Sequence, residues 1–281
     1  MPAINNNLHQ LAVLVLFVGY VKYQTCFFIF IGNFNMRPLI AGNWKMNGSI
    51  ASGAALVAAI MEQRAEIDPG CDILVCPPFL AIRTIGDLIQ NSPIFLGAQD
   101  CHKDSEGAHT GDVSAKMLSD VGCEFVIVGH SERRANHREI DETVLFKAEA
   151  AHANNLSAII CVGETLVDRQ NDKTLSIIEN QFNGSVPKSS MPNNTVIAYE
   201  PVWAIGTGLT PSPMQIAEVH DFIRELLKKN FVEAEAFRVI YGGSVNPGNS
   251  KEILSINNVD GSLVGGASLK SEDFWAICKS V

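Results

Sequence analysis

Short apolar runs alternate with longer segments of helical periodicity along most of this chain. From residue 36 onward, eight runs of four or five mainly aliphatic residues recur, with polar turn residues between them and the helical segments. This alternation predicts parallel β-α-β units. The predicted strands are residues 39–43, 73–76, 94–98, 125–128, 158–161, 195–199, 238–241 and 261–264, and the clearest predicted helices are residues 49–65, 139–153, 174–182 and 213–229.

The segment 213–229 illustrates the helical pattern, because Ile216, Val219, Ile223 and Leu226 fall on one face of a helix. Eight β-α units in about 245 residues match a closed (β/α)8 barrel, whereas a doubly wound sheet usually has fewer strands. We therefore predict a single α/β domain, a (β/α)8 barrel, over residues 36–281.

The first 35 residues do not share this pattern. Residues 11–21 form an unbroken apolar run, residues 22–25 interrupt it, and residues 26–31 resume it. The span approaches the length that crosses a bilayer, but residues 1–10 contain no Lys or Arg, and no A-x-A cleavage site follows. Three interpretations are open: a weak membrane or targeting segment, an apolar arm packed on the barrel, or upstream sequence translated from a start codon placed too early. The domain that begins at Met36 favours the last.

Charge and cysteine content narrow the function classes. The chain has a formal net charge of −9 and a pI near 5.2. Because binding to nucleic acid needs clustered Lys and Arg, this charge argues against it, and an anionic substrate needs a local positive pocket. Seven cysteines, without C-x-x-C spacing, fit a reducing compartment better than a disulfide framework or a zinc site. We expect a cytoplasmic protein.

Polar residues and glycines gather where the predicted strands end. Active sites of such barrels lie at the carboxyl ends of the strands and in the loops that follow. We therefore expect one site built from the residues at these ends, which are Asn43, Lys45, Gln99, His130, Glu200, Gly242, Gly243, Ser244, Gly265 and Gly266.

Two of these residues indicate stabilisation of negative charge on oxygen. The Lys45 ammonium could meet a phosphate or an oxyanion, although a strand-end lysine is often only a solvated charge. His130 precedes a Ser-Glu-Arg-Arg string, so its ring is expected near the start of a short helix, which disfavours the imidazolium. A neutral imidazole there can donate a hydrogen bond to a carbonyl oxygen, and a satisfied core histidine is the alternative.

Glu200 ends an apolar strand and precedes a proline. An aliphatic neighbourhood would raise the pKa of its carboxyl group and make it a better base toward a carbon-bound hydrogen, whereas the alternative is a structural ion pair. The next residues form an apolar tip between a proline and two glycines, which we expect to close over a substrate rather than to pack statically. This predicted lid consists of Pro201, Val202, Trp203, Ala204, Ile205, Gly206, Thr207 and Gly208.

Paired glycines follow the last two predicted strands, at residues 242–243 and 265–266. Glycine lets backbone N–H groups approach an anion closely, and phosphate commonly binds after strands seven and eight of these barrels. The two pairs predict a phosphate site, and ordinary tight turns are the alternative.

With these residues the chain resembles the triosephosphate isomerase family, from about Met36 to Val281. The resemblance rests on six strings in that family's order: GNWKMN (42–47), GHSERR (129–134), CVGE (161–164), AYEPVWAIGTG (198–208), YGGSV (241–245) and LVGGAS (263–268). It implies the TIM barrel fold and the reversible isomerisation of dihydroxyacetone phosphate and D-glyceraldehyde 3-phosphate through a cis-enediolate. This reaction belongs to glycolysis and gluconeogenesis, and the resemblance implies no metal and no cofactor.

The resemblance also implies catalytic roles. Glu200 is expected to be the base that moves the proton between two carbons, and His130 the electrophile. Lys45 and Asn43 would stabilise the developing oxyanion, and Glu132 would hold Lys45 or its neighbours in place.

Further residues are implied to bind the substrate and to enclose it. Main-chain donors at four positions would hold the phosphate, and two apolar side chains would close over Glu200. The phosphate residues are Gly206, Ser244, Gly265 and Gly266, and the apolar residues are Ile205 and Leu263.

The family is usually homodimeric, and residues 107–112 resemble its interdigitating loop, with Gln99 and Thr110 expected near the partner's site. Leu209, Pro211 and His109 depart from the family pattern. Pro211 removes a backbone donor that relatives use with a tyrosine equivalent to Tyr241, so one hydrogen bond of the closed lid is expected to be lost.

Two other functions stay open from the residues alone. A phosphate-binding barrel could use Lys45 to form a Schiff base as an aldolase. Alternatively, the barrel could be a non-catalytic surface or adhesion scaffold tethered through the apolar extension. Four polar residues that converge on one barrel mouth argue against the scaffold.

Overall fold

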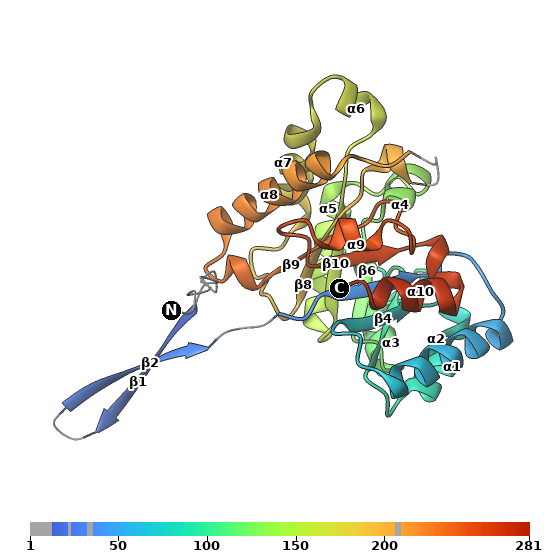
Figure 1. The fold of residues 1–281 in the computed structure, drawn as a ribbon, viewed down its shortest axis with the longest axis horizontal. Helices are drawn as coiled ribbons and strands as arrows, with labels where there is room; N and C mark the ends of the chain where they lie inside the picture. The colour runs from blue at the N-terminus through green and yellow to red at the C-terminus, as the bar shows by residue number, and fades with distance from the viewer. Residues whose placement is uncertain (1–12, 22–23, 33–35, 206–208) are drawn as a thin grey trace, which may run out of the picture. The chain divides into compact units, whose positions relative to one another are not determined.

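The computed structural model describes residues 13–21, 24–32, 36–205 and 209–281, and residues 37–281 form a closed barrel of eight parallel strands (Figure 1). The predicted TIM barrel is confirmed. Strand order follows the sequence, and β10 closes the barrel on β3 with Leu263 opposite Ala41. The strands are β3 (Leu39–Asn43), β4 (Asp72–Cys76), β5 (Ile94–Ala98), β6 (Phe125–Val128), β7 (Ser157–Val162), β8 (Thr195–Tyr199), β9 (Arg238–Tyr241) and β10 (Gly261–Val264).

Helices connect consecutive strands and surround the barrel (Figure 1). The four predicted helices correspond to α1, α5, α7 and α8, with ends that differ by up to three residues. Ser212 caps α8 by accepting the Gln215 N–H, and Pro213 takes the first position, where its missing N–H costs nothing. The α-helices are α1 (Ile50–Glu66), α2 (Phe79–Ile89), α3 (Ala115–Asp120), α4 (Ser131–Asn136), α5 (Asp141–Ala153), α6 (Leu166–Gln170), α7 (Thr174–Ser185), α8 (Pro213–Asn230), α9 (Ser250–Leu254) and α10 (Ser271–Cys278), and the 3-10 helices are η1 (Val202–Ala204), η2 (Ala234–Ala236) and η3 (Gly266–Leu269).

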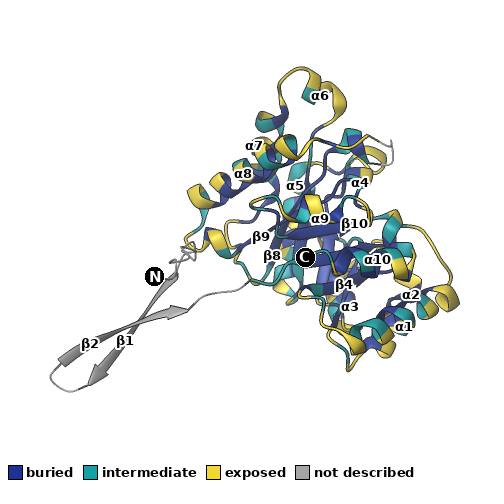
Figure 2. Ribbon diagram, viewed as in Figure 1, coloured by how far each residue is buried: buried dark blue, intermediate teal, exposed yellow. Residues whose placement is uncertain are grey.

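Alternate residues of each strand face opposite sides of the barrel wall. Ile40 and Ile197 belong to a core shared with the helices, whereas their neighbours in the strands form a separate apolar cluster that fills the barrel. Both sides are therefore buried, as the dark blue strands in Figure 2 show, which explains why the strands read as unbroken apolar runs. The inner cluster consists of Leu39, Ala41, Leu74, Cys76, Phe125, Ile127, Ile159, Cys161, Val196, Ala198, Ile240 and Leu263.

This alternation directs two of the predicted catalytic residues to the barrel mouth. In β3 the inward row continues from Ala41 to Asn43, and in β8 it continues from Ala198 to Glu200. Asn43 is 5% exposed and Glu200 is 1% exposed. The barrel wall thus fixes where their side chains begin, and its apolar lining excludes water below them.

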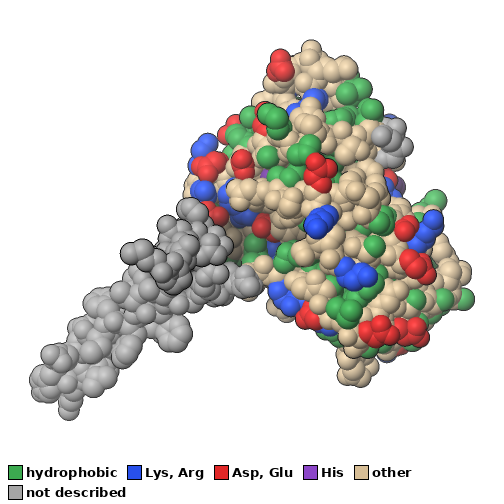
Figure 3. Space-filling model, viewed as in Figure 1, with side chains coloured by type: hydrophobic (Ala, Val, Ile, Leu, Met, Phe, Trp, Pro, Cys, Tyr) green, Lys and Arg blue, Asp and Glu red, His purple; other side chains and the backbone are tan. Residues whose placement is uncertain are grey.

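The surface of the barrel unit carries both signs of charge. On the face drawn in Figure 3, acidic and basic side chains lie interspersed among polar and apolar ones. Charged side chains elsewhere described on this unit form exposed ion pairs, such as Lys228 with Glu225 at 3.0 Å and Arg83 with Asp87 at 3.0 Å. Exposed pairs of this kind contribute little to stability.

Residues 1–36 form a separate unit, whose described backbone is an antiparallel hairpin of β1 (Val13–Val21) and β2 (Gln24–Gly32). The two apolar runs of the extension thus pair with each other, with Val13 opposite Gly32 and Val21 opposite Gln24. Within the described ranges, no helix combines the length and apolar character needed to span a membrane.

A buried histidine on α8 gives the barrel a pH-sensitive contact. His220 is fully buried beside Tyr199 and Tyr241, and its Nδ1 lies 2.9 Å from the carbonyl oxygen of Asn258. Burial lowers the pKa of His220 to about 4. The neutral ring donates from Nδ1, and the folded protein resists protonation at this position.

We expect His220 to reduce stability in acid. Between its ordinary pKa of 6.5 and its folded pKa of about 4, the unfolded chain binds a proton that the folded chain does not, so the free energy of unfolding falls as pH falls through this window. The amide of His220→Gln can still donate to Asn258 but does not titrate. Between about pH 7 and about pH 4.5, the free energy of unfolding should therefore fall by about 2–3 kcal/mol less in this variant than in the wild type. Urea unfolding at both pH values measures this, and equal losses would contradict the assignment.

Candidate active site

The carboxylate of Glu200 lies inside the barrel mouth at the end of β8. Its Oε2 accepts a hydrogen bond from the Ser131 N–H at 2.8 Å, and its Oε1 accepts one from the Ser131 hydroxyl at 3.3 Å. Oε1 also lies 2.9 Å from His130 Nε2. Because a buried carboxylate is costly without partners, these contacts make the position tolerable.

These contacts reverse the pKa shift that the sequence predicts for Glu200. Burial raises the pKa of the carboxyl group, but the charge and hydrogen bond of His130, the N–H of Ser131 and the charge of Lys45 together outweigh it. The pKa of Glu200 therefore lies below its ordinary value of 4.5, and the expected rise is wrong for this conformation. A Glu200 that takes a proton from carbon must first leave Ser131 and His130.

His130 links β6 to the start of α4. The preceding Gly129 has φ of +66°, and a Cβ there would lie 2.7 Å from the Val144 side chain, so glycine is required at this turn. Nδ1 of His130 accepts the Glu132 N–H at 3.2 Å and so caps the helix. Its ring is 7% exposed.

The His130 ring has one arrangement that satisfies both of its nitrogens. Burial lowers the pKa of His130, but the Glu200 carboxylate raises it more, so this pKa lies above its ordinary value. Opposing this, a second proton at Nδ1 would face the Glu132 N–H that now donates to it. The proton that His130 donates to Glu200 is therefore the one on Nε2.

Lys45 adopts a strained backbone conformation beside this pair. Its φ is +53°, and a non-glycine residue in this region costs about 1–3 kcal/mol. Asn43 Oδ1 accepts the Lys45 N–H at 3.1 Å, and Gln99 Nε2 donates to the Lys45 carbonyl at 2.9 Å. The Lys45 ammonium lies 2.5 Å from Glu132 Oε1, which connects β3 to α4 across the mouth.

Two glycines beside β8 provide the space that Glu200 occupies. A Cβ at Gly163, after β7, would lie 1.7 Å from the Glu200 carbonyl oxygen, and a Cβ at Gly242, after β9, would lie 2.9 Å from Glu200 Cγ. The sequence predicts anion binding for Gly242 and no role for Gly163. Both glycines directly follow the strands that flank β8, and this position in the sequence could have predicted that they make room for Glu200.

Two arginines of α4 fix the segment that carries His130 and Ser131. Arg134 donates to the carbonyl oxygens of Gly129 at 2.8 Å and Cys161 at 3.1 Å. Arg133 lies 2.9 Å from Asp100 and 2.6 Å from Glu139. The GHSERR string thus combines the polar groups at the mouth with the anchors that hold them, and Ser131 was not predicted as a partner of Glu200.

The amino-terminal part of the predicted lid is attached to a buried glutamate. Glu164 accepts hydrogen bonds at Oε1 from Trp203 Nε1 at 2.9 Å and from the Tyr199 hydroxyl at 3.2 Å, and its carbonyl accepts the Val202 N–H at 3.1 Å. Burial raises the pKa of Glu164, and these donors and Arg169 only partly offset it. The sequence places Glu164 in the CVGE string and predicts no role for its side chain.

The remaining lid residues divide between described and undescribed positions. Pro201 and Ala204 are buried, and Ile205 is half-buried. Gly206, Thr207 and Gly208 of the predicted lid lie outside the described residues. Gly206 is also one of the residues predicted to bind the phosphate.

The other predicted phosphate residues follow β9 and β10. Gly265 lies beside the Lys45 side chain, because a Cβ there would meet Lys45 Cε at 3.4 Å, and Gly266 borders open space. Ser244 is half-buried, and its carbonyl accepts the Asn249 side-chain amide at 3.1 Å. Leu263, on the inward row of β10, is 3% exposed.

The residues predicted to face a partner differ in their surroundings. Gln99 is engaged within this chain, since its amide also donates to the Cys76 carbonyl at 2.9 Å. Thr110 is exposed in the loop that follows β5.

Within the described part of the chain, the buried Tyr241 hydroxyl has no hydrogen-bond partner, and Pro211 has no N–H to offer it.

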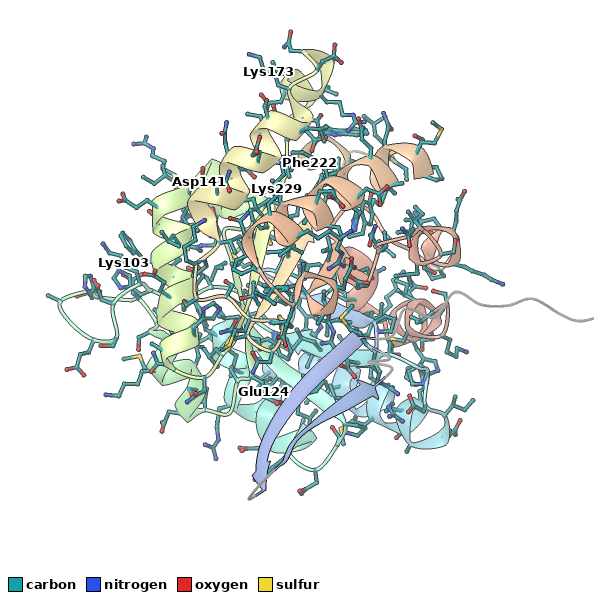
Figure 4. The ribbon with its side chains drawn as sticks, turned by 90° about the vertical axis from the view of Figure 1, so that its left-hand side faces the viewer. Lys103, Glu124, Asp141, Lys173, Phe222 and Lys229 are labelled. Atoms are coloured by element: carbon teal, nitrogen blue, oxygen red, sulfur yellow. The ribbon has the colours of Figure 1, made fainter. Side chains whose placement is uncertain are left out.

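A pocket of about 330 Å³ lies away from these residues. It is formed between α2 and the segment that precedes β6, and Glu124, labelled in Figure 4, lines it together with Arg83, Asp87 and Asp120. None of the predicted catalytic residues lines it, so the convergence of side chains at the barrel mouth, and not this pocket, identifies the candidate active site.

Comparison with known proteins agrees with this geometry. The family model of triosephosphate isomerase matches residues 38–281. The triosephosphate isomerase of Bradyrhizobium diazoefficiens is 51% identical over 245 residues, which are 87% of this chain and 97% of that protein. That of Bradyrhizobium sp. (strain ORS 278) is 52% identical over 246 residues, 87% of this chain and 98% of that protein. The crystal structure of triosephosphate isomerase from Bartonella henselae superimposes with a TM-score of 0.81 at 42% identity and covers 87% of this chain and 98% of that one. The chain belongs to the triosephosphate isomerase family.

Proposed function

We propose that this protein interconverts dihydroxyacetone phosphate and D-glyceraldehyde 3-phosphate by proton transfer at Glu200. The observation that carries the proposal is the convergence of a buried carboxylate, an imidazole and an ammonium at one barrel mouth. Glu200 lies 2.9 Å from His130, and Lys45 lies 2.5 Å from Glu132 on the same helix that His130 caps. These groups supply a base, a hydrogen-bond donor and a positive charge, which the isomerisation requires.

Glu200 acts on the carbon-bound hydrogen. Its carboxylate removes a proton from C1 of dihydroxyacetone phosphate, and the electrons of the C–H bond form the double bond of a cis-enediolate while the carbonyl oxygen becomes negative. A proton then passes from O1 to O2 of the enediolate, and the protonated Glu200 returns its proton to C2, which produces the aldehyde. One carboxylate therefore serves both directions and is regenerated in each cycle.

His130 and Lys45 stabilise the negative oxygen. The Nε2–H of His130 is aimed into the mouth, because Nδ1 is fixed by the Glu132 N–H. Once Glu200 moves away, this donor becomes available to the substrate oxygen. Lys45, with Asn43 beside it, adds a charge that gains strength in a mouth from which water is excluded.

The resting contacts of Glu200 make catalysis depend on a movement. While bound to Ser131 and His130, the carboxylate has a lowered pKa and is a weak base. Displacement from these donors into a dry site leaves burial as the dominant effect, which raises the pKa. Substrate binding and lid closure thus switch Glu200 from a stable anion to a base.

The lid and the glycine turns would hold the phosphate and exclude water. The lid begins at Pro201 and is tied to Glu164 through Trp203. Gly265 lies beside the Lys45 side chain, and Gly266 follows it, so backbone donors and a cation occur together where an anion is expected. With Ser244 and Gly206 they form the proposed phosphate site.

The comparisons do not favour the aldolase and scaffold alternatives. A Schiff base also needs an amine with a free lone pair. The Nζ of Lys45 is instead engaged in a close ion pair with Glu132.

We also propose a cytoplasmic location. The six cysteines of the barrel unit, residues 37–281, are all free and buried, which suits a reducing compartment.

The proposed assembly is a homodimer that contacts through the loops at the barrel mouth. Met46 follows β3 and is 96% exposed, and Leu80, near the start of α2, is 88% exposed. Since β3 and β4 are neighbours, these side chains leave the same end of the barrel. Large apolar side chains so exposed favour an interface. The loop with Thr110 follows β5 at the same end.

Removal of the base should abolish turnover with the fold intact. We expect Glu200→Gln to reduce kcat by about 10²–10⁴-fold, because general-base catalysis contributes this much. Glu149→Gln, at an exposed position of α5, is the matched control and should keep wild-type turnover. A coupled assay with glyceraldehyde 3-phosphate and circular dichroism measure both, and undiminished turnover in Glu200→Gln would refute its role.

A charge in the proposed interface should separate the subunits. Met46→Glu would place a carboxylate in the apolar contact, so we expect a monomer at a concentration where the wild type is dimeric. Met214→Glu, at an 83% exposed position on α8, is the control and should stay dimeric. Sedimentation velocity distinguishes the two, and a wild type that sediments as a monomer would overturn the dimer itself.

A further inference from the structure

Two cysteines that lie far apart in the sequence meet at the end of the barrel opposite the mouth. Cys71 directly precedes β4, and Cys278 is the last residue of α10. Cys71 is 2% exposed, and Cys278 is fully buried. Since the mouth lies at the carboxyl ends of the strands, the amino end of β4 faces away from it. The mechanism above uses neither thiol.

The two thiols are in direct contact. The Cys71 S–H donates to the Cys278 carbonyl oxygen at 3.6 Å, and the Cys71 sulfur also forms a hydrogen bond with the Cys278 thiol. The last four carbonyls of a helix have no N–H partner within it, so the Cys71 thiol satisfies one of these groups of α10. The fold therefore brings together two sulfurs that are 207 positions apart in the sequence.

Other groups fix the backbone on each side of this contact. Arg37 donates to the Cys71 carbonyl at 2.9 Å and pairs with Asp68 at 2.6 Å. On α10, the Phe274 ring packs against Gly42 of β3, where a Cβ would lie 3.2 Å from the ring. Both sulfurs are thus held at one place before any bond joins them.

A small oxidant can reach the pair when the last turn of α10 opens. The helix ends at Cys278, and both Lys279 and Val281 beyond it are exposed. The Lys279 N–H donates to the Trp275 carbonyl at 3.0 Å within the same turn. Helix ends held by so few bonds fray at a low cost in free energy. Opening there exposes the sulfurs while Phe274 keeps the start of the helix packed.

We propose that Cys71 and Cys278 form a reversible disulfide when the protein meets a peroxide. In cytoplasmic proteins a disulfide is usually transient and responds to oxidation. The peroxide oxidises one sulfur to a sulfenic acid, and one water leaves. The second sulfur then attacks the sulfenic sulfur, the S–S bond forms, and the hydroxyl group leaves as a second water with the proton of that thiol. Two electrons pass from the sulfurs to the peroxide, and a thiol reductant reverses the step by exchange.

Cys71 is the sulfur that we expect to meet the peroxide first. The hydrogen bond with Cys71 and burial raise the pKa of Cys278 well above its ordinary value, so Cys278 stays a thiol. Cys71 lies on a loop and is the more exposed of the two. A sulfenic acid at Cys71 then has the Cys278 thiol beside it to complete the bond.

The bond has a consequence for stability and none for catalysis. It joins the connection before β4 to the end of α10 and closes a loop that spans 207 positions, which restricts the unfolded chain. It also holds the last turn of α10 closed. Because the catalytic residues lie at the other end of the barrel, turnover is expected to stay the same.

Peroxide treatment of the full chain, followed by peptide mapping, tests the bond. The protein is reduced, freed of reductant and exposed briefly to hydrogen peroxide, and its free thiols are then blocked. A tryptic peptide that carries Cys278 should be linked to the one that carries Cys71, and dithiothreitol should separate the two. The thermal unfolding midpoint of the oxidised protein should rise by about 5–10 °C, with unchanged turnover.

Three serine variants assign the linkage. Cys71→Ser and Cys278→Ser keep a small polar side chain at each position and should give no linked peptide and no rise in the unfolding midpoint. Because the tryptic peptide of Cys71 also carries Cys76, the Cys71→Ser variant identifies which sulfur is joined. Cys123→Ser, at a cysteine that is 5% exposed, is the matched control and should respond to peroxide as the wild type does.

Two results would overturn the proposal. One is a wild type in which peroxide yields no link between Cys71 and Cys278 and leaves them as free thiols or as sulfinic acids. The other is an equal rise of the unfolding midpoint in either of the two serine variants at these positions, each shown to be folded by circular dichroism. Neither readout depends on isomerase activity, so this outcome is independent of the proposed function.

Discussion

The contact between the Glu200 carboxylate and the start of α4 is the interaction on which the site depends. A glutamate 1% exposed is tolerable only because the Ser131 N–H and His130 Nε2 lie within 2.9 Å of its oxygens. The same donors lower the pKa of Glu200. They therefore stabilise its carboxylate in the folded protein and, at the same time, make that carboxylate a weaker base. In the proposed mechanism, substrate binding replaces these donors, and part of the binding energy raises the basicity of Glu200.

The barrel supplies this contact through backbone geometry. Alternation along β8 turns Glu200 inward, and Gly163 and Gly242 leave room for it on both sides. The left-handed turn at Gly129 then redirects the chain after β6 so that α4 points its first N–H groups at the mouth. A rigid wall and a few glycines thus place groups 69 residues apart within hydrogen-bond distance.

Sequence periodicity predicted the fold because burial on both sides makes each strand an apolar run. It also placed Glu200, His130 and Lys45 at strand ends, where a parallel barrel brings them together. The pKa direction of Glu200 and its partner Ser131 could not be predicted, because they depend on distances between β8 and α4. The strained φ of Lys45 and the clearance at Gly163 likewise emerge only from packing.

Exchange with solvent tests the central role of Glu200 most directly. A carboxylate that carries a substrate proton trades it with water before returning it, so wild-type protein in deuterium oxide should place one deuterium on C1 of dihydroxyacetone phosphate, as followed by proton NMR. A folded Glu200→Gln protein should place none at a comparable rate. If the wild type left the substrate free of deuterium, or if the variant exchanged it as fast, the account would be contradicted.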